Sequence, residues 1–175
     1  MTNQLEIKLL SDDATMPTRD RLDAGFDIYS AETLILEPQD KAVIKTDVAV
    51  NIPEGYVGLL TSRSGVSSKT HLVIETGKID AGYQGNLGIN IKNDMEKSIR
   101  VKPKAFTTNN MYGLNNTKGE EIGLFFQPSC YQIKKGDKLA QLVIVPIWTP
   151  ALKQVDEFHT ESERGENGFG STGYV

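Results

Sequence analysis

The chain has 175 residues, of which 38% are hydrophobic and 24% are charged, and its formal net charge is −4. That length suits one domain with a sizeable core, while the acidic balance excludes the basic surface expected of a nucleic-acid-binding protein. No apolar run approaches the roughly 18 to 20 residues of a membrane helix. The first ten residues lack the layout of a signal peptide, so we expect a cytoplasmic protein without membrane contact.

Short β-prone runs separated by Gly, Pro, Asn and Asp dominate the chain. No window carries a helical stripe of several turns, and the one expected helical turn covers residues 64–69. Many short strands at close spacing indicate an all-β sandwich or jelly-roll barrel. The predicted strands are 5–10, 26–29, 34–36, 41–50, 56–61, 88–92, 99–101, 124–126, 139–145 and 151–155.

The sequence offers few nitrogen or sulfur ligands for a metal ion. Cys130 is the single cysteine, so an internal disulfide is excluded, and only His71 and His159 could add nitrogen ligands. A nitrogen–sulfur metal cage is therefore not expected. Any metal should be a hard cation with oxygen ligands, such as Mg²⁺.

Two polar motifs come first along the chain. The segment 24–27 places Asp27 shortly after a glycine, and Thr61-Ser62-Arg63-Ser64-Gly65 lies where a predicted strand meets the helical turn. Hydroxyls, a guanidinium and helix N-terminal amides together suit a phosphate chain. A capped turn with a surface arginine explains the same residues without a ligand.

A third motif lies at residues 77–85, which are predicted to form a strand, a turn with Asp80 and Tyr83, and a second strand. Backbone groups in a glycine-flanked hairpin can read a base. A carboxylate in the turn could orient a water for attack, and a tyrosine ring could pack on a sugar. The alternative is an aspartate present only because it favours turns.

The second half of the chain adds three features. Gln141 lies in an otherwise apolar strand, where its amide needs a backbone partner or a ligand. A polar segment from about 94 to 128 carries several aromatic residues. The glycine-rich tail contains Arg164 and Phe169, so it is either a disordered end or a segment that closes over a ligand.

Taken in order, five motifs resemble those of the trimeric dUTPase (dUTP pyrophosphatase) family. They are 24–32, 63–69, 77–85, 136–142 and 164–173. The resemblance implies a jelly-roll β-barrel that forms a homotrimer, binds dUTP and uses Mg²⁺. It implies a domain over residues 1–163, including the insertion at about 94–128, and an exchanged C-terminal arm at 164–175.

The resemblance also implies roles for the hairpin and its turn. Asp80 would hold and activate the water that attacks the α-phosphate of dUTP. Tyr83 would stack on the deoxyribose and exclude a 2′-hydroxyl. The backbone around Ile74, Gly77 and Ile79 would bind the uracil edge too closely to admit the methyl group of thymine.

The phosphates would be bound by Ser64, Gly65 and Gln141, with Arg63 supporting their loop. Asp27 would help to place Mg²⁺ through water.

The arm would supply the remaining ligand contacts. Phe169 would cover the uracil. The γ-phosphate would be gripped by Arg164, Gly170, Ser171 and Thr172, and Arg164 would share charge neutralisation with Mg²⁺. These parts together would hydrolyse dUTP to dUMP and pyrophosphate.

The sequence departs from the family pattern in three places. Ile74 stands where some members have a polar residue, and Asn86 stands where glutamate is common. Roughly sixty positions separate Asp80 from Gln141, about twice the family spacing, so some thirty residues are inserted there. Phage members with such insertions resemble regulators that also bind a repressor protein. Deleting the insertion is then expected to abolish partner binding and spare catalysis.

Two alternatives remain at this stage. A related dCTP deaminase shares the fold and several motifs but needs added acid–base residues. A regulatory binding protein on a dUTPase scaffold would need no catalysis. Ammonia release from dCTP and pyrophosphate release from dUTP distinguish these possibilities.

Overall fold

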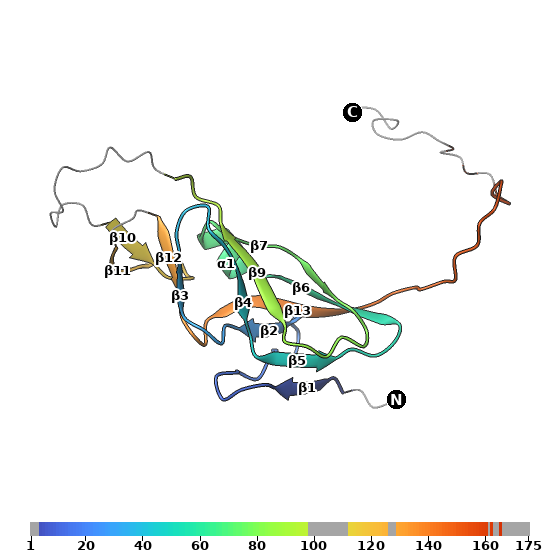
Figure 1. Cartoon of the computed structure of the whole chain (residues 1–175), viewed down its shortest axis with the longest axis horizontal. Helices are drawn as coiled ribbons and strands as arrows, with labels where there is room; N and C mark the ends of the chain where they lie inside the picture. Colours follow the sequence, from blue (N-terminus) through green and yellow to red (C-terminus); the bar gives the residue numbers. More distant parts are fainter. Residues whose placement is uncertain (1–3, 98–111, 126–128, 161, 163–164, 166–175) are drawn as a thin grey trace.

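The computed structural model describes residues 4–97, 112–125, 129–160, 162 and 165 (Figure 1). This part of the chain is all-β apart from one short helix, which confirms the predicted fold class. The elements are β1 (Glu6–Leu9), β2 (Phe26–Tyr29), β3 (Leu34–Leu36), β4 (Lys41–Lys45), β5 (Val48–Asn51), β6 (Tyr56–Ser62), α1 (Ser64–Lys69), β7 (Leu72–Ile74), β8 (Gly77–Ile79), β9 (Gly88–Asn93), β10 (Tyr112–Asn115), β11 (Glu121–Phe125), β12 (Cys130–Ile133) and β13 (Lys138–Pro146).

Two sheets enclose the core. One has the order β2-β13-β6-β8 and the other has the order β4-β9-β7. Alternate residues of their strands point inward, so each sheet contributes branched aliphatic side chains to one buried cluster. The least exposed members include Ile28, Ile44, Leu60, Leu72, Ile89, Ile91, Leu139 and Leu142.

The buried side chain of Asn93 ties the second sheet to its neighbours. Its Nδ2 donates to the backbone oxygens of Leu36 and Ser129 at 3.1 and 2.9 Å, and its Oδ1 accepts from the amide of Met95. Both polar atoms of its side chain therefore have hydrogen-bond partners, which offsets the cost of burying an amide.

The predicted strand 41–50 is two strands, which corrects the sequence interpretation. β4 pairs with β9, whereas β5 pairs with β1. Asp47 separates them with a positive φ of 52°. The Asn86 side chain holds this corner by accepting from the Asp47 amide and donating to its carboxylate. A run of β-branched residues gave no local signal for such a break.

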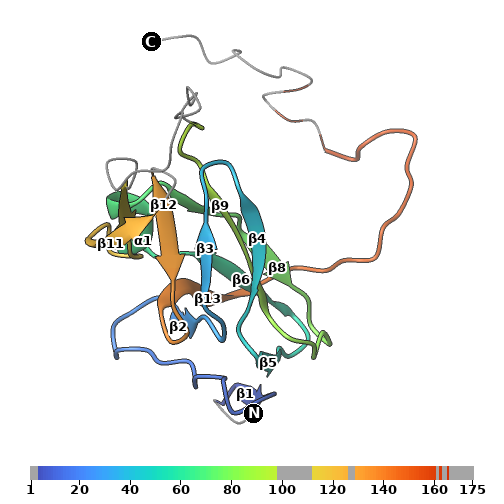
Figure 2. The ribbon, with the colours of Figure 1, turned by 60° about the vertical axis from the view of Figure 1, so that its left-hand side comes forward.

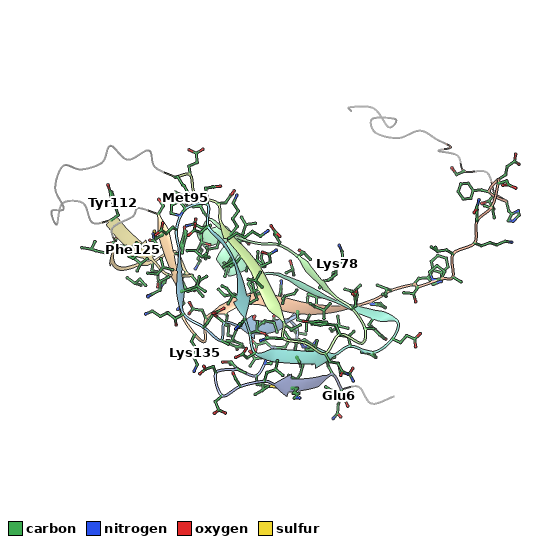
Figure 3. All side chains as sticks on the ribbon, viewed as in Figure 1. Glu6, Lys78, Met95, Tyr112, Phe125 and Lys135 are labelled. Atoms are coloured by element: carbon green, nitrogen blue, oxygen red, sulfur yellow. The ribbon has the colours of Figure 1, made fainter. Side chains whose placement is uncertain are left out.

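Part of the insertion forms a β-hairpin that extends the molecule (Figure 2). β10 pairs antiparallel with β11 and parallel with β12, and β12 pairs with β3. Figure 3 shows Tyr112 and Phe125 on this hairpin. The predicted strand 124–126 overlaps β11, whereas β10 and β12 were not predicted.

The other predicted elements have mixed outcomes. Residues 26–29, 34–36 and 64–69 match their elements, and the strands around 56–61, 88–92 and 139–145 differ only at their ends. The predicted strand 151–155 is wrong, since these residues pair with no strand in the described part of the chain. Residues 99–101 lie outside that part. No helix among the described residues is long and apolar enough to cross a membrane.

Candidate active site

Three of the polar motifs converge where β13 lies between β2 and the end of β6. Gln141 on β13 lies opposite both Asp27 on β2 and Thr61 on β6. β6 ends at Ser62, and α1 begins at Ser64. The strand register therefore brings a carboxylate, an amide and the start of α1 to the same place.

Asp27 is held there by two cations. Its Oδ1 accepts from Arg63 Nε at 2.6 Å, and its Oδ2 accepts from Lys138 Nζ at 2.9 Å. Only 18% of the Asp27 side chain is exposed, so these ion pairs are screened less than surface pairs. We call Asp27, Arg63, Lys138 and Gln141 the phosphate-side cluster.

The contacts within the cluster lower the pKa of Asp27 and raise the pKa of Lys138. Desolvation of Asp27 opposes its ionisation, but the hydrogen bond from Lys138 and the charge of Arg63 together lower its pKa. The same hydrogen bond raises the pKa of Lys138. Asp27 and Lys138 therefore remain charged near neutral pH, and with the guanidinium of Arg63 the cluster carries one net positive charge.

The amide of Gln141 is oriented by the backbone. Its Nε2 donates to the Ser62 carbonyl at 3.1 Å. A Cβ on Gly25 would lie 3.2 Å from Gln141 Oε1, so the glycine permits this close approach. Ser64 is exposed, and the space beside Gly65 is open. A phosphate could reach this backbone without displacing a side chain.

The hairpin predicted at 77–85 does not form, because β8 pairs with β6 whereas the next strand, β9, belongs to the other sheet. β7 likewise pairs with β9 rather than with β8. The segment 74–79 presents its backbone rather than the side chain of Ile74. That side chain is buried, with only 7% exposed. Gly77 and Ile79 pair with Leu60 and Gly58 on β6. The buried Ile74 side chain is not accessible to a base, so any base contact at this segment would come from main-chain groups.

The turn after β8 is a tight loop, and we call residues 80–86 the Asp80 loop. The Tyr83 amide donates to the Asp80 carbonyl at 3.1 Å, and Gly82 adopts a positive φ of 87°. The Tyr83 ring lies directly over Gly85, where a Cβ would come within 2.6 Å of Tyr83 Cζ. The Asp80 carboxylate makes no hydrogen bond to another described residue, so it is available to water.

Asn86 anchors the end of this loop, a role that the sequence interpretation did not assign. Its carbonyl accepts from the Tyr83 hydroxyl at 3.0 Å, while its side chain binds the corner at Thr46 and Asp47. The Asn86 side chain, which stands where the family often has glutamate, therefore has a structural role. The polar side chain flanked by glycine and leucine was the available signal.

The phosphate-side cluster and the Asp80 loop lie at opposite ends of β6. Ile79 pairs with Gly58, near the start of the strand, whereas Ser62 ends it. At about 3.3 Å per residue, Asp80 and Ser62 are roughly 15 Å apart along β6. A single chain therefore does not bring the two groups together.

Five predicted site residues lie outside the part of the chain that the structure describes. These are Arg164, Phe169, Gly170, Ser171 and Thr172. Conversely, Lys138 belongs to the cluster although no role was predicted for it. A lysine at the first position of a strand carries no local functional signal, and only the pairing of β13 with β2 places it beside Asp27.

The cluster fits Mg²⁺ only indirectly. Among the described residues, no group of three or more His, Cys, Asp or Glu side chains could hold a metal ion. Each carboxylate oxygen of Asp27 already accepts from a cation. Asp27 could still accept a hydrogen bond from water on a metal that has its main ligands elsewhere, such as phosphate oxygens.

Comparison with known proteins identifies the family to which this all-β protein belongs. The dUTPase family model matches residues 12–105 and 124–173. The chain belongs to the dUTPase family. The residues left unmatched between these two segments, 106–123, are fewer than the insertion of about 94–128 expected from spacing, and they include β10.

Two curated relatives illustrate the similarity. The deoxyuridine 5′-triphosphate nucleotidohydrolase of Clostridium tetani is 34% identical, with 97% of this chain and 96% of the relative covered. The mitochondrial human enzyme of that name is 33% identical over 97% of this chain. The chain spans 55% of the length of the human relative.

Solved structures of phage enzymes are more similar still. The dUTPase of Staphylococcus bacteriophage 80alpha with dUpNHpp is 64% identical and has a TM-score of 0.87, covering 98% of this chain and 99% of that one. A dUTPase from phage phi11 of S. aureus, whose species-specific insert is visible, is 63% identical with a TM-score of 0.81, covering 91% and 100%. A phi11 mutant coordinates a structural Mg(II) ion.

Proposed function

We propose that this chain hydrolyses dUTP to dUMP and pyrophosphate. The observation that carries the proposal is the Asp80 loop. Gly82 adopts a positive φ there and Gly85 lies under the Tyr83 ring, so the two glycines fix Tyr83 in the loop that carries the exposed carboxylate of Asp80. A regulatory scaffold without catalysis would have no need for this geometry. The family to which the chain belongs supports the same reaction.

The mechanism divides between the two halves of the site. Asp80 holds and activates the water that attacks the α-phosphate in line with the leaving pyrophosphate. Tyr83 stacks on the deoxyribose and leaves no room for a 2′-hydroxyl. The backbone of residues 74–79 binds the uracil edge and rejects the larger thymine.

The other half binds the triphosphate. Ser64, Gly65 and Gln141 donate hydrogen bonds to phosphate oxygens, and their positions follow from the start of α1 and from the register of β13. Arg63 holds its loop through Asp27. Because the positive charge is fixed before the ligand arrives, little reorganisation is needed during the reaction.

Mg²⁺ bound to the phosphates would neutralise charge on the triphosphate and help to stabilise the leaving group. Asp27 would accept hydrogen bonds from water around this ion. The arm, residues 164–175, would close over the ligand, with Phe169 on the uracil. Arg164, Gly170, Ser171 and Thr172 would bind the γ-phosphate.

A homotrimer would complete the site. The separation of about 15 Å along β6 requires the Asp80 loop of one chain to meet the phosphate-side cluster of another. The segment after β13 runs away from the body (Figure 2). It exposes Trp148, Leu152 and Phe158 by 88%, 98% and 89%. Burial of such side chains on neighbouring subunits would stabilise the assembly and direct each arm to a neighbour's site.

The first test is pyrophosphate release from dUTP, with dTTP, dCTP and UTP as controls. We expect Mg²⁺-dependent hydrolysis of dUTP alone. In the cell the enzyme would act on the nucleotide pool of the cytoplasm, or of the host cytoplasm if the gene is carried by a phage. Asp80→Asn should reduce kcat by about a thousandfold, since it removes the general base. Hydrolysis that is unchanged in this variant would refute the role of Asp80.

Deamination of dCTP is disfavoured by the surroundings of Glu75. Such a reaction needs added acid–base residues, and Glu75 directly follows β7. Its carboxylate is bound by Lys41 at 2.7 Å and by Asn90 at 2.5 Å, on the outer face of the β4-β9-β7 sheet. It is therefore committed to structure, and we expect no ammonia from dCTP.

A second, regulatory role is supported by the insertion. Within the β10–β11 hairpin, Ile122 and Leu124 are 40% and 61% exposed, which is typical of a small docking surface. The related 80alpha dUTPase is described as controlling transfer of virulence genes by a G protein-like mechanism. We propose that this surface, within residues 94–128, binds a repressor protein.

The regulatory role is best tested with surface variants. Leu124→Ser should weaken binding of a purified repressor that a related phage dUTPase recognises, without changing dUTP hydrolysis. Leu22→Ser is the matched control, because Leu22 is 85% exposed and lies outside the hairpin. Equal repressor binding by both variants would place the docking surface elsewhere.

A further inference from the structure

The turn of the β10–β11 hairpin, residues 116–120, lies against two segments of the body. The first contact joins it to the turn that precedes β13. Thr117 is buried, and its hydroxyl donates to Asp137 Oδ2 at 3.3 Å. The same oxygen accepts from the Lys134 amide, and the Asp137 carbonyl accepts from the Ser30 amide.

This contact lies one residue from the phosphate-side cluster. Asp137 precedes Lys138, whose ammonium binds Asp27 at 2.9 Å. The backbone of the turn at Asp137 sets where β13 starts, and therefore where Lys138 stands relative to β2. Thr117 thus braces the turn from which one of the two cations on Asp27 projects.

The second contact is with the end of α1. Gly119 has a positive φ of 77°, and a Cβ there would overlap the carbonyl oxygen of Lys69, the last residue of the helix. Only glycine allows the two backbones to approach this closely. The helix starts at Ser64 and Gly65 and has only six residues, so its two ends move together.

The turn is stiff enough to act as a brace. The Asn116 side chain accepts from the amides of Lys118 and Glu120 and donates to the Glu120 carboxylate. The backbone adds hydrogen bonds between Asn116 and Glu120 and from Gly119 to Asn116. Such a network fixes the turn independently of the rest of the insertion.

We propose that this turn is a positioning element of the phosphate half of the active site. Gly119 fixes α1 from its far end, and Thr117 fixes the turn that precedes Lys138. The inference rests on the proposed function and gives the insertion a part in catalysis in addition to any role in docking. It also implies that deleting the whole hairpin will raise KM for dUTP, contrary to the expectation from sequence that the deletion spares catalysis.

The test compares Gly119→Ala with Gly123→Ala. Gly123 lies on β11 of the same hairpin and has open space around its Cβ position, so it is the matched control. The measurements are KM and kcat for dUTP and the inhibition constant of deoxyuridine, which carries no phosphate. We expect Gly119→Ala to raise KM for dUTP by about three- to tenfold. Its kcat and the deoxyuridine constant should stay near wild type.

A general loss of stability would give a different pattern, in which kcat falls with the active fraction and KM is unchanged. That pattern would overturn the proposal, as would equal behaviour of the two glycine variants or a parallel rise in the deoxyuridine constant. If Gly119→Ala fails to fold, Thr117→Val replaces it. Thr117→Val should raise KM in the same way, and Thr117→Ser should restore it; a wild-type KM in Thr117→Val would refute the brace.

If the wild type releases no pyrophosphate, the proposed reaction fails, but the brace can still be tested. Calorimetric binding of the non-hydrolysable analogue dUpNHpp then replaces KM. Weaker binding by Gly119→Ala than by Gly123→Ala would support the positioning role, and equal binding would refute it.

Discussion

The two halves of the site are made rigid in different ways. The phosphate-side cluster is held by charge, with Asp27 between Arg63 and Lys138. The Asp80 loop is held by backbone geometry, with Gly85 under the Tyr83 ring. Charge suits the half that we propose binds the anionic triphosphate, while close packing suits the half that we propose discriminates the base and the sugar by shape. The two halves should therefore respond differently to pH and to substitution.

The strongest test of this division is complementation between subunits. Asp80→Asn and the double variant Arg63→Ala/Gln141→Ala should each be nearly inactive alone. If every site takes its two halves from different chains, trimers assembled at random from equal amounts of both should recover about one quarter of wild-type activity. The measurement is dUTP hydrolysis by the whole population of trimers assembled from equal amounts of both variants, without selection for mixed trimers. Sites built within one chain would recover nothing.

A smaller effect is expected within the Asp80 loop. Gly85→Ala would push the Tyr83 ring from its place, because the new Cβ would lie within 2.6 Å of Tyr83 Cζ. The preference for dUTP over UTP, measured as a ratio of kcat/KM values, should fall about tenfold.

Tyr83→Phe is the graded control. It keeps the ring and loses only the hydrogen bond to the Asn86 carbonyl, so it should retain most of the preference. Full rejection of UTP by Gly85→Ala would show that ring placement does not set sugar selectivity.

The smallest effect concerns stability at the phosphate-side cluster. Because the pKa of Asp27 is lowered in the folded chain, its ionisation stabilises the fold above the usual carboxyl range. That contribution is lost as the pH falls through the lowered pKa. Asp27→Asn should therefore lower the melting temperature at pH 7 by about 2 to 4 °C.

The difference in melting temperature between wild type and Asp27→Asn should disappear in acid. Asp12→Asn, at an exposed position, serves as the control. A difference that persists unchanged to pH 3 would mean that packing, rather than the charge of Asp27, is responsible.

Local pattern was sufficient for much of this protein. Strands such as Phe26–Tyr29 were predicted with their observed bounds, because turn-forming residues flank short β-prone runs. The bounds of helix α1 were also predicted as observed. The all-β class follows from the same regularity. The order of the five motifs identified the family, which the family match confirms. Residue types alone also singled out Asp27, Arg63, Asp80, Tyr83 and Gln141.

Other features depended on partners distant in the sequence. The strand predicted at 41–50 breaks at Asp47 because Asn86 binds that corner. The predicted strand 151–155 has β propensity but pairs with no strand in the described part of the chain, and a strand needs a partner. Lys138 joins the cluster only through the pairing of β13 with β2.

The insertion shows most clearly that contacts between distant segments cannot be predicted from local sequence. Its composition revealed a polar segment with aromatic residues, but β10 and β12 pair in parallel across the sheet, and Gly119 meets the end of α1 far along the chain. Turn chemistry and alternation act over a few residues, so they can be read from the sequence. Register, ion pairing and close backbone approach depend on which distant segments meet, and only the packed tertiary structure decides that.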